Sequence, residues 1–230
     1  MRTFTWEREA IRFGAWNGRG DRCYVALAGT TPQPSVQCIS QLLDKLRAEG
    51  FRHAVTAALR EEETSVFRSV GFQLHERLLV FAHSLADISK PTHRTRRVSR
   101  GRIDQILAVD KQCFQPFWQL DRVSLNDALH ATEHVRFRTI GSPPALGYAV
   151  TGMSGTTGYL QRLGVAPSAQ NQGVGTALIQ DCLAWLKGRH ATQAIVNTQM
   201  SNVKAQRLYQ HNGFSHRLDD LVVLEVDLTS

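Results

Sequence analysis

Residues 170–176 (QNQGVGT) constrain the fold more than any other part of this 230-residue sequence. They stand between a strand-like segment, residues 158–165, and an apolar helix-like segment, residues 176–187. The first amides of a helix have no partner inside the helix and lie at the positive end of its dipole, so a phosphate can satisfy them. Gly173 and Gly175 leave room for an anion, and either can adopt a positive φ. The sequence therefore predicts a strand–turn–helix unit with an anion site at its turn.

The glycine spacing alone does not identify the ligand. It differs from the dinucleotide-binding G-x-G-x-x-G and from the P-loop, which needs a lysine that this turn lacks. A turn without any ligand fits it equally well. The following segments add information, because residues 193–199 alternate like a strand and residues 202–214 read N-x-x-A-x-x-L-Y-x-x-x-G-F.

Together with the LGVAP segment of residues 163–167, these motifs are similar to those of the GNAT acyltransferases, the Gcn5-related N-acetyltransferases. The resemblance covers roughly residues 94–228. It implies an α/β (α+β) fold with a mixed, mostly antiparallel, splayed sheet and helices on both faces. It also implies an acetyltransferase that uses acetyl-CoA as co-substrate, needs no metal, and transfers the acetyl group to a primary amine of a small molecule or a protein N-terminus.

The resemblance implies a role for each matching residue. Pantetheine would lie along the backbone of one strand, with an amide near Leu163 facing the thioester oxygen, while the side chains of that strand belong to the core. The turn would hold the diphosphate. The implied coenzyme A residues are Leu163, Gly164, Val165, Gln170, Asn171, Gln172, Gly173, Val174, Gly175, Thr176 and Asn202.

Two of the matching residues have a simpler alternative. Tyr209 would be the general acid for the thiolate, because a phenol with a pKa of about 10 is protonated at neutral pH. Alternatively, it is an aromatic residue of an amphipathic helix with an idle hydroxyl. Asn202 would bond the pantetheine arm or cap the helix that follows it, and the two roles are compatible.

The acceptor side is less defined. The segment from Phe114 to Trp118 (FQPFW) loosely resembles one in RimI-type ribosomal-protein alanine acetyltransferases, so Phe114, Phe117 and Trp118 would line the acceptor pocket or cap the core. That subfamily has a catalytic glutamate where this chain has Asn197. An amide cannot take a proton, so the base lies elsewhere, or water serves, or the substrate needs little help.

Three titratable residues, Glu133, His134 and His211, are alternative bases without positional support. The acceptor itself offers another solution. An α-amine has an ordinary pKa of about 8 and a lysine amine one of about 10.4, so the α-amine is unprotonated far more often at neutral pH. The missing carboxylate therefore favours an acceptor amine of low pKa.

The first part of the chain contains a weak repeat of the second. An offset of about 142 residues places Gly71-Phe72 on Gly213-Phe214, and it aligns predicted elements at residues 36–48, 53–59, 61–70 and 78–82 with their counterparts. Its chemistry has been lost: Thr31 and Gln33 replace the two glycines beside Pro32 and Pro34, Phe67 replaces Tyr209, and Arg60 replaces Asn202. Prolines also remove amide donors.

We therefore predict a degenerate, truncated GNAT-like unit at residues 1–88 that binds no coenzyme A and serves as scaffold or substrate wall. A linker at residues 89–93 follows, and then a catalytic domain at residues 94–230. Within that domain, before the strand expected at residues 158–165, we expect a strand near residues 94–98, helices at 103–113 and at 122–130 (capped by Asp121), and strands at 135–140 and 145–151.

The formal charge of +7 suits a polyanionic ligand such as coenzyme A. It would also suit ribosome or RNA contact, which gives a second function class, a basic interaction protein; a non-catalytic acyl-CoA binder is a third. The densest basic run, residues 93–102, is interpreted as a solvated linker entering an exposed strand, so a nucleic-acid partner is not expected.

Apolar runs are too short to span a membrane, and the first residues lack a secretory signal pattern. We therefore expect a cytoplasmic location and no membrane partner. Four scattered cysteines without metal-type spacing are read as reduced core thiols.

Overall fold

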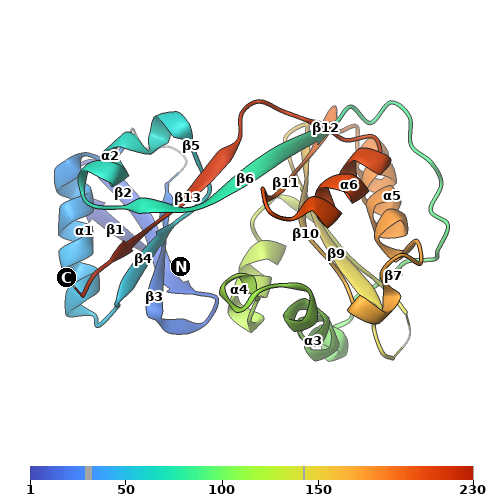
Figure 1. Ribbon diagram of the computed structural model, residues 1–230, viewed down its shortest axis with the longest axis horizontal. Helices are drawn as coiled ribbons and strands as arrows, with labels where there is room; N and C mark the ends of the chain where they lie inside the picture. Colours follow the sequence, from blue (N-terminus) through green and yellow to red (C-terminus); the bar gives the residue numbers. More distant parts are fainter. Residues whose placement is uncertain (29–32, 142, 230) are drawn as a thin grey trace. The chain divides into compact units, whose positions relative to one another are not determined.

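The computed structural model describes residues 1–28, 33–141 and 143–229 (Figure 1). Contacts divide the chain into two compact units. The first consists of residues 1–79, the short segment Gln199–Ser201 and the C-terminal segment from Leu218. The second consists of Val80–Thr198 and Asn202–Arg217.

The first unit is a sheet covered by one long helix. Its strands begin with an antiparallel meander, and β3 then pairs in parallel with β4 across helix α1, Val36–Ala48. The short α2, Ser65–Ser69, follows a single 3-10 turn, Glu61–Glu63. The strands are β1 Arg2–Trp6, β2 Glu9–Trp16, β3 Arg19–Leu27, β4 His53–Thr56, β5 Leu59–Arg60, β6 Gln73–His83 and β13 Leu221–Asp227.

The second unit has helices on both faces of a mostly antiparallel sheet. Figure 1 shows α5 and α6 on one face of β9 and β10, with α3 and α4 on the other. The sheet order is β11-β10-β9-β8-β7. The strands are β7 Arg96–Arg97, β8 His134–Ile140, β9 Gly147–Ser154, β10 Thr157–Val165, β11 Gln193–Gln199 and β12 Ser215–His216; the helices are α3 Ile103–Cys113, α4 Arg122–Leu129, α5 Val174–Lys187 and α6 Val203–His211.

The pattern of apolar residues explains these elements. In α1, residues Leu42, Leu43 and Leu46 are buried in the core of the first unit, and Ser35 caps the helix by accepting a bond from the Cys38 amide at 3.1 Å. In the second unit Asp121 caps α4 as predicted, accepting from the Ser124 amide at 2.7 Å.

The expected domain boundary differs from the observed one. Residues 218–230 were placed in the second domain, yet β13 pairs with β4, β5 and β6 and belongs to the first unit. The physical reason is burial, because Val222, Leu224 and Val226 alternate along β13 and join the core of that unit. Conversely, the end of β6, from Val80, counts with the second unit, where it pairs with β12.

Most expected elements are present, and α1, α3 and β11 have the expected bounds. The helix expected at residues 61–70 is instead a 3-10 turn followed by α2, and the strand expected at 53–59 is split into β4 and β5. The three strands before residue 28 were not predicted. One signal for them was present in the sequence, since Asn17-Gly18 connects β2 to β3 with both φ angles positive, a hairpin turn that this dipeptide favours.

Candidate functional site

The main feature of the second unit is a separation between β10 and β11. The two strands pair in parallel only over residues 157–159 and 193–195, so Tyr159 and Ile195 form the last pair. Beyond this point β10 pairs with β9 alone, and a register shift between Leu160 and Arg162 leaves Gln161 as a bulge. The backbone of residues 160–165 therefore presents an edge toward the opening.

The turn after β10 has free amide groups. Gly173 precedes α5 with a φ of +77°, and the first intrahelical bond runs from the Ala177 amide to its carbonyl at 2.9 Å. No side chain caps the helix. Among the described residues, the amides from Gly173 to Thr176 have no hydrogen-bond partner, so they can donate hydrogen bonds to an anionic ligand.

The two glycines of the turn have different physical roles. Gly173 needs its positive φ, and a Cβ there would lie 3.2 Å from the His93 ring. Gly175 is buried within α5, and its Cβ would lie 2.9 Å from Leu208 Cδ2. The expectation that either glycine could adopt a positive φ therefore applies only to Gly173, while Gly175 allows α5 and α6 to pack closely.

Tyr209 on α6 is buried, with 6 % of its surface exposed, and its ring packs against Phe81 and Phe214. Within the described part of the chain its hydroxyl has no hydrogen-bond partner. Burial raises the pKa of Tyr209 well above its ordinary value, and the positive charge of Arg162 opposes that rise. The phenol is thus protonated at neutral pH.

Asn202 caps α6, which confirms one of its two expected roles. Its Oδ1 accepts from the Ala205 amide at 3.2 Å, and its Nδ2 donates to Thr198 Oγ1 at 3.1 Å. Both ends of the side-chain amide are therefore already bonded. Asn197, on the same strand as Thr198, is exposed.

The aromatic segment after α3 is held by a buried ionic network that sequence reasoning missed. Asp110 is fully buried and pairs with Arg162, whose Nη2 lies 2.7 Å from both the carboxylate and the Trp118 carbonyl oxygen. The Tyr148 hydroxyl donates to the same carboxylate, and the Arg162 guanidinium lies 3.4 Å from the centre of the Phe114 ring. A signal did exist, because Asp110 occupies an apolar position of an amphipathic helix.

Phe114, Phe117 and Trp118 are half-buried, and the rings of Phe117 and Trp118 meet edge to face at 4.8 Å. The network fixes this segment beside Arg162, the residue that follows the bulge of β10. The network thereby holds these aromatic residues next to β10.

A cavity of about 450 Å³ lies where β10 and β11 separate. It brings together residues of both strands and of the segment after α4, and none of its lining side chains carries a charge: Ala131, Thr132, Ser154, Tyr159, Leu160, Gln161, Ile195, Val196 and Asn197. Asn197, the position at which a carboxylate was expected, is therefore part of this site.

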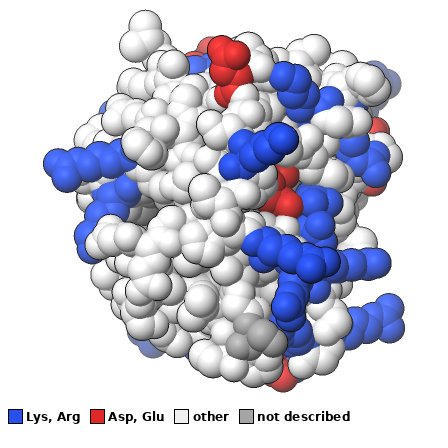
Figure 2. Space-filling model, turned by 90° about the vertical axis from the view of Figure 1, so that its right-hand side faces the viewer, with Lys and Arg blue, Asp and Glu red and all other residues white. Residues whose placement is uncertain are grey.

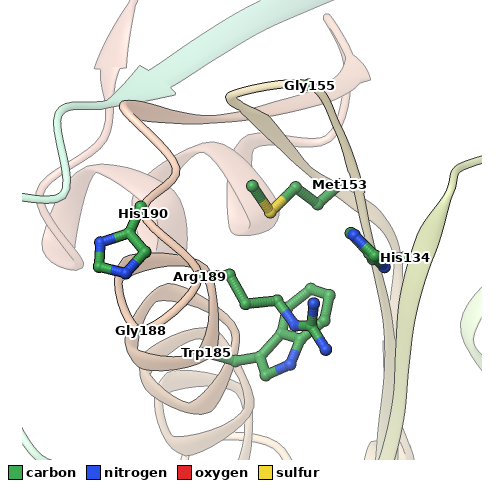
Figure 3. A pocket seen from close by; sticks show the side chains of 7 residues that line it. All are labelled: His134, Met153, Gly155, Trp185, Gly188, Arg189 and His190. Carbon is green, nitrogen blue, oxygen red and sulfur yellow. The ribbon is translucent and has the colours of Figure 1, made fainter.

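A larger cavity, about 610 Å³, lies at the C-terminal end of α5, away from the turn at Gly173 (Figure 3). The side chains of Trp185 and Arg189 lie side by side there, with the guanidinium 5.1 Å from the ring centre, and Met153 and His134 project from β9 and β8. None of the predicted coenzyme A residues lines it. His134, one of the three alternative bases, is located here, and Glu133 and His211 are exposed.

The face of the molecule in Figure 2 carries many Lys and Arg side chains and few acidic ones. Within the basic run, Arg94, Arg96, Arg97 and Arg100 are exposed, as expected of a solvated segment entering an exposed strand. Arg136 and Arg138 on β8 share the carboxylate of Asp181 on α5. The run thus adjoins further cationic side chains.

The residues that the structure describes also bear on metal binding and membrane insertion. No group of three His, Cys, Asp or Glu side chains there could hold a metal ion. No helix in the same residues is long and apolar enough to cross a membrane. All four cysteines are free.

Part of the chain is similar to one known protein family. Residues 103–214 match the model of the acetyltransferase (GNAT) family. The chain is 35 % identical over 68 residues to an aminoglycoside N(6')-acetyltransferase type 1 of Klebsiella aerogenes, which covers 30 % of this chain and 45 % of that protein. It is 37 % identical over 59 residues to a mycothiol acetyltransferase of Beutenbergia cavernae, which covers 26 % of this chain and 20 % of that protein. The matches thus span less than half the length of these curated relatives.

Solved structures share the fold at low identity. A GCN5-related N-acetyltransferase from Kribbella flavida matches with a TM-score of 0.66 and 13 % identity, over 100 % of this chain and 90 % of that one. A GCN5-related N-acetyltransferase from Sphaerobacter thermophilus matches with a TM-score of 0.62 and 14 % identity, over 95 % of this chain and 76 % of that one. The ribosomal-protein-S18-alanine N-acetyltransferase from Escherichia coli matches with a TM-score of 0.50 and 15 % identity, over 60 % of this chain and 94 % of that one. At these identities the likeness concerns the fold alone.

Proposed function

We propose that this protein is an N-acetyltransferase that transfers an acetyl group from acetyl-CoA to a primary amine, because residues 103–214 match the model of the acetyltransferase (GNAT) family. The observation that carries the proposal is the opening between β10 and β11 beside a helix N-terminus with free amides. The opening suits an extended thioester arm, and the amides suit its diphosphate.

In this proposal the pantetheine arm follows the free edge of β10 at Leu163, Gly164 and Val165. The amide near Leu163 faces the thioester oxygen, where a fixed N–H donor stabilises the charge of the tetrahedral intermediate. The diphosphate lies on the turn from Gln170 to Thr176. Asn202, whose amide already caps α6, supports the arm by fixing the end of β11.

Transfer then requires two proton movements. The neutral amine nitrogen attacks the thioester carbon, the N–C bond forms and the C–S bond breaks. The departing thiolate takes the proton of the Tyr209 hydroxyl, and the nitrogen releases its surplus proton to water, from which the phenolate recovers one. The Arg162 charge, which acts on Tyr209, stabilises the transient phenolate.

The acceptor is proposed to be the α-amine of a peptide or protein, or a small amine of low pKa. This follows from Asn197, which supplies no base in the cavity. Phe114, Phe117 and Trp118, held by Arg162, form the proposed wall of the acceptor pocket.

Thiol release from acetyl-CoA with a panel of amines and peptides tests the proposal. Tyr209→Phe should lower kcat by roughly a hundredfold or more while acetyl-CoA still binds, because it removes only the proton donor. Tyr24→Phe, which removes the hydroxyl of a tyrosine on β3 of the first unit, is the matched control and should leave kcat unchanged. Binding of acetyl-CoA without thiol release with any amine would instead identify a non-catalytic acyl-CoA binder.

For residues 1–88 we propose a degenerate copy of the same unit, without a coenzyme A site. Two features support it. The order β3-α1-β4-α2 parallels β10-α5-β11-α6, including the parallel strand pair in each. Gly71 and Gly213, which the offset aligns, both have a positive φ, +96° and +83°. Thr31 and Pro32 lie outside the described residues.

A further inference from the structure

Gln161 is the residue of the β10 bulge, and it lines the cavity at which β10 and β11 separate. Its side-chain oxygen, Oε1, is buried and has no hydrogen-bond partner among the described residues. A buried carbonyl oxygen without a donor is unfavourable, so native proteins rarely leave one without a reason. Because Gln161 also lines the cavity, a ligand bound there is a candidate source of that donor.

The orientation of this side chain is set by its neighbours. Its Nε2 makes a long contact of 3.5 Å with Thr132 Oγ1, and Thr132 uses its own hydroxyl proton on the His134 carbonyl oxygen at 2.9 Å. The Thr132 oxygen can therefore only accept from Gln161, which directs the amide nitrogen toward Thr132 and leaves Oε1 as the free atom.

Gly152 provides the space for this arrangement. A Cβ at position 152 would lie 2.4 Å from both Gln161 Nε2 and Thr132 Oγ1. Any larger residue on this part of β9 would displace the glutamine. Three elements, β9, β10 and the segment after α4, thus hold the Gln161 side chain in an orientation that leaves its Oε1 unpaired among the described residues.

The lining of the cavity indicates the ligand chemistry. A carbonyl-type oxygen needs an N–H or O–H donor, and no charged side chain lines the cavity to neutralise a cation. An ammonium group that enters such a space loses hydration without gaining a counter-charge, so its pKa falls and the neutral amine is favoured. A neutral primary amine satisfies both conditions.

We infer that Gln161 is an acceptor-binding residue whose Oε1 receives an N–H of the neutral acceptor amine. The inference rests on the proposed acetyltransferase function and extends it. The uncharged cavity performs part of the task of the missing base, because it selects the unprotonated amine. The substrate class is therefore primary amines of low pKa, such as peptide α-amines, in preference to lysine-type amines.

Steady-state kinetics of the full-length protein test the inference, with acetyl-CoA and a short peptide whose only amine is its α-amine. Gln161→Met removes the acceptor oxygen at similar volume. The KM for the peptide should rise roughly tenfold, the loss of about one hydrogen bond, while the KM for acetyl-CoA and the melting temperature stay unchanged.

Gln180→Met is the matched control, because Gln180 on α5 also has a buried Oε1 that lacks a partner among the described residues, but it does not line the cavity. It should leave both KM values unchanged. If Gln161→Met behaves like this control in an active enzyme, the inference is wrong and the proposed function stands. A rise confined to the KM of acetyl-CoA would assign the donor to pantetheine and also overturn the inference. If the unmodified protein releases no thiol with any amine, the proposed function itself fails.

Discussion

The carboxylate of Glu9 accepts hydrogen bonds from both the amide and the hydroxyl of Ser35, at 3.0 and 2.9 Å. Ser35 is the N-cap of α1, so a carboxylate of the first unit lies at the helix end where an anion would otherwise bind. The corresponding cap of α5 in the second unit is Gly173, which has no side chain. The two helix ends therefore differ in whether an internal anion already occupies them.

We accordingly expect one acetyl-CoA per chain. Titration calorimetry on the full-length protein should give a stoichiometry of one, and Glu9→Ala should not raise it, because Pro34 beside the cap also lacks an amide proton. Gly173→Pro, which distorts the α5 turn, should abolish the binding. A stoichiometry of two would contradict the assignment of the first unit.

The buried pair of Asp110 and Arg162 should contribute strongly to stability. Arg162→Met leaves a fully buried carboxylate without its counter-charge, which typically costs about 3–5 kcal/mol. The double variant Asp110→Leu/Arg162→Met should be more stable than Arg162→Met alone, because no uncompensated charge is left. Urea unfolding measures both.

The exposed pair of Arg122 and Asp104 provides the control for that experiment, with side chains 62 % and 75 % exposed. Arg122→Met should change the unfolding free energy by no more than about 1 kcal/mol. Equal effects of Arg122→Met and Arg162→Met would show that burial of the pair is not what matters.

Gly173→Ala should weaken acetyl-CoA binding as well as stability. The φ of +77° is unfavourable for alanine by about 1–2 kcal/mol, and the new Cβ would contact the His93 ring. Gly155→Ala introduces similar strain, since its φ is +53°, but in open space at the β9–β10 turn. Thermal unfolding should therefore respond to both variants, and acetyl-CoA affinity only to Gly173→Ala. A loss of affinity in Gly155→Ala would indicate a global effect of strain.

Asp181 should make stability depend on pH in acid. Its burial raises the pKa, but hydrogen bonds from Arg136 and Thr95 outweigh this, so its pKa lies below the ordinary 3.8. A carboxyl whose pKa is lowered by folding stabilises the protein above its unfolded pKa, and this contribution is lost as the pH falls through the folded pKa. The difference in unfolding free energy between the unmodified protein and Asp181→Asn should be constant above about pH 5 and shrink below pH 4.

That measurement uses urea unfolding from pH 7 to pH 3. Asp104→Asn, at an exposed position of α3, should show little difference from the unmodified protein at any pH in this range. A difference for Asp181→Asn that grows toward acid pH would contradict the assigned direction of the shift.

The cysteines should react slowly in the folded protein. Burial raises the pKa of Cys23 and Cys113 to about 11 and that of Cys38 and Cys182 to about 12, so little thiolate exists at pH 8. Alkylation with a thiol reagent should be slow before and rapid after addition of urea. Cys113, the one that is not fully buried, should react first. Rapid native labelling of Cys182 would contradict its burial in α5.

Local sequence determined the bounds of several helices and strands and the positions of the helix caps. The periodicity of apolar residues fixed the bounds of α1, α3 and β11, and Asp121 and Asn202 marked helix starts, because caps and periodicity act within a few residues. The turn around Gly173 was also readable, because a strand, a glycine and a helix follow each other directly. These features depend on short-range backbone chemistry, which a single sequence contains.

Only the tertiary structure decided how distant residues meet. β13 joins the first unit because its buried side chains fit that core, although it is the last strand of the chain. Asp110 meets Arg162, and Gln161 meets Thr132 and Gly152, across strands and helices that are far apart in sequence. Strand pairing and side-chain packing depend on residues that are far apart in sequence, and local patterns do not predict which of these residues pair. Local sequence therefore determines the secondary structure of most segments, whereas long-range packing determines which residues meet at the candidate site.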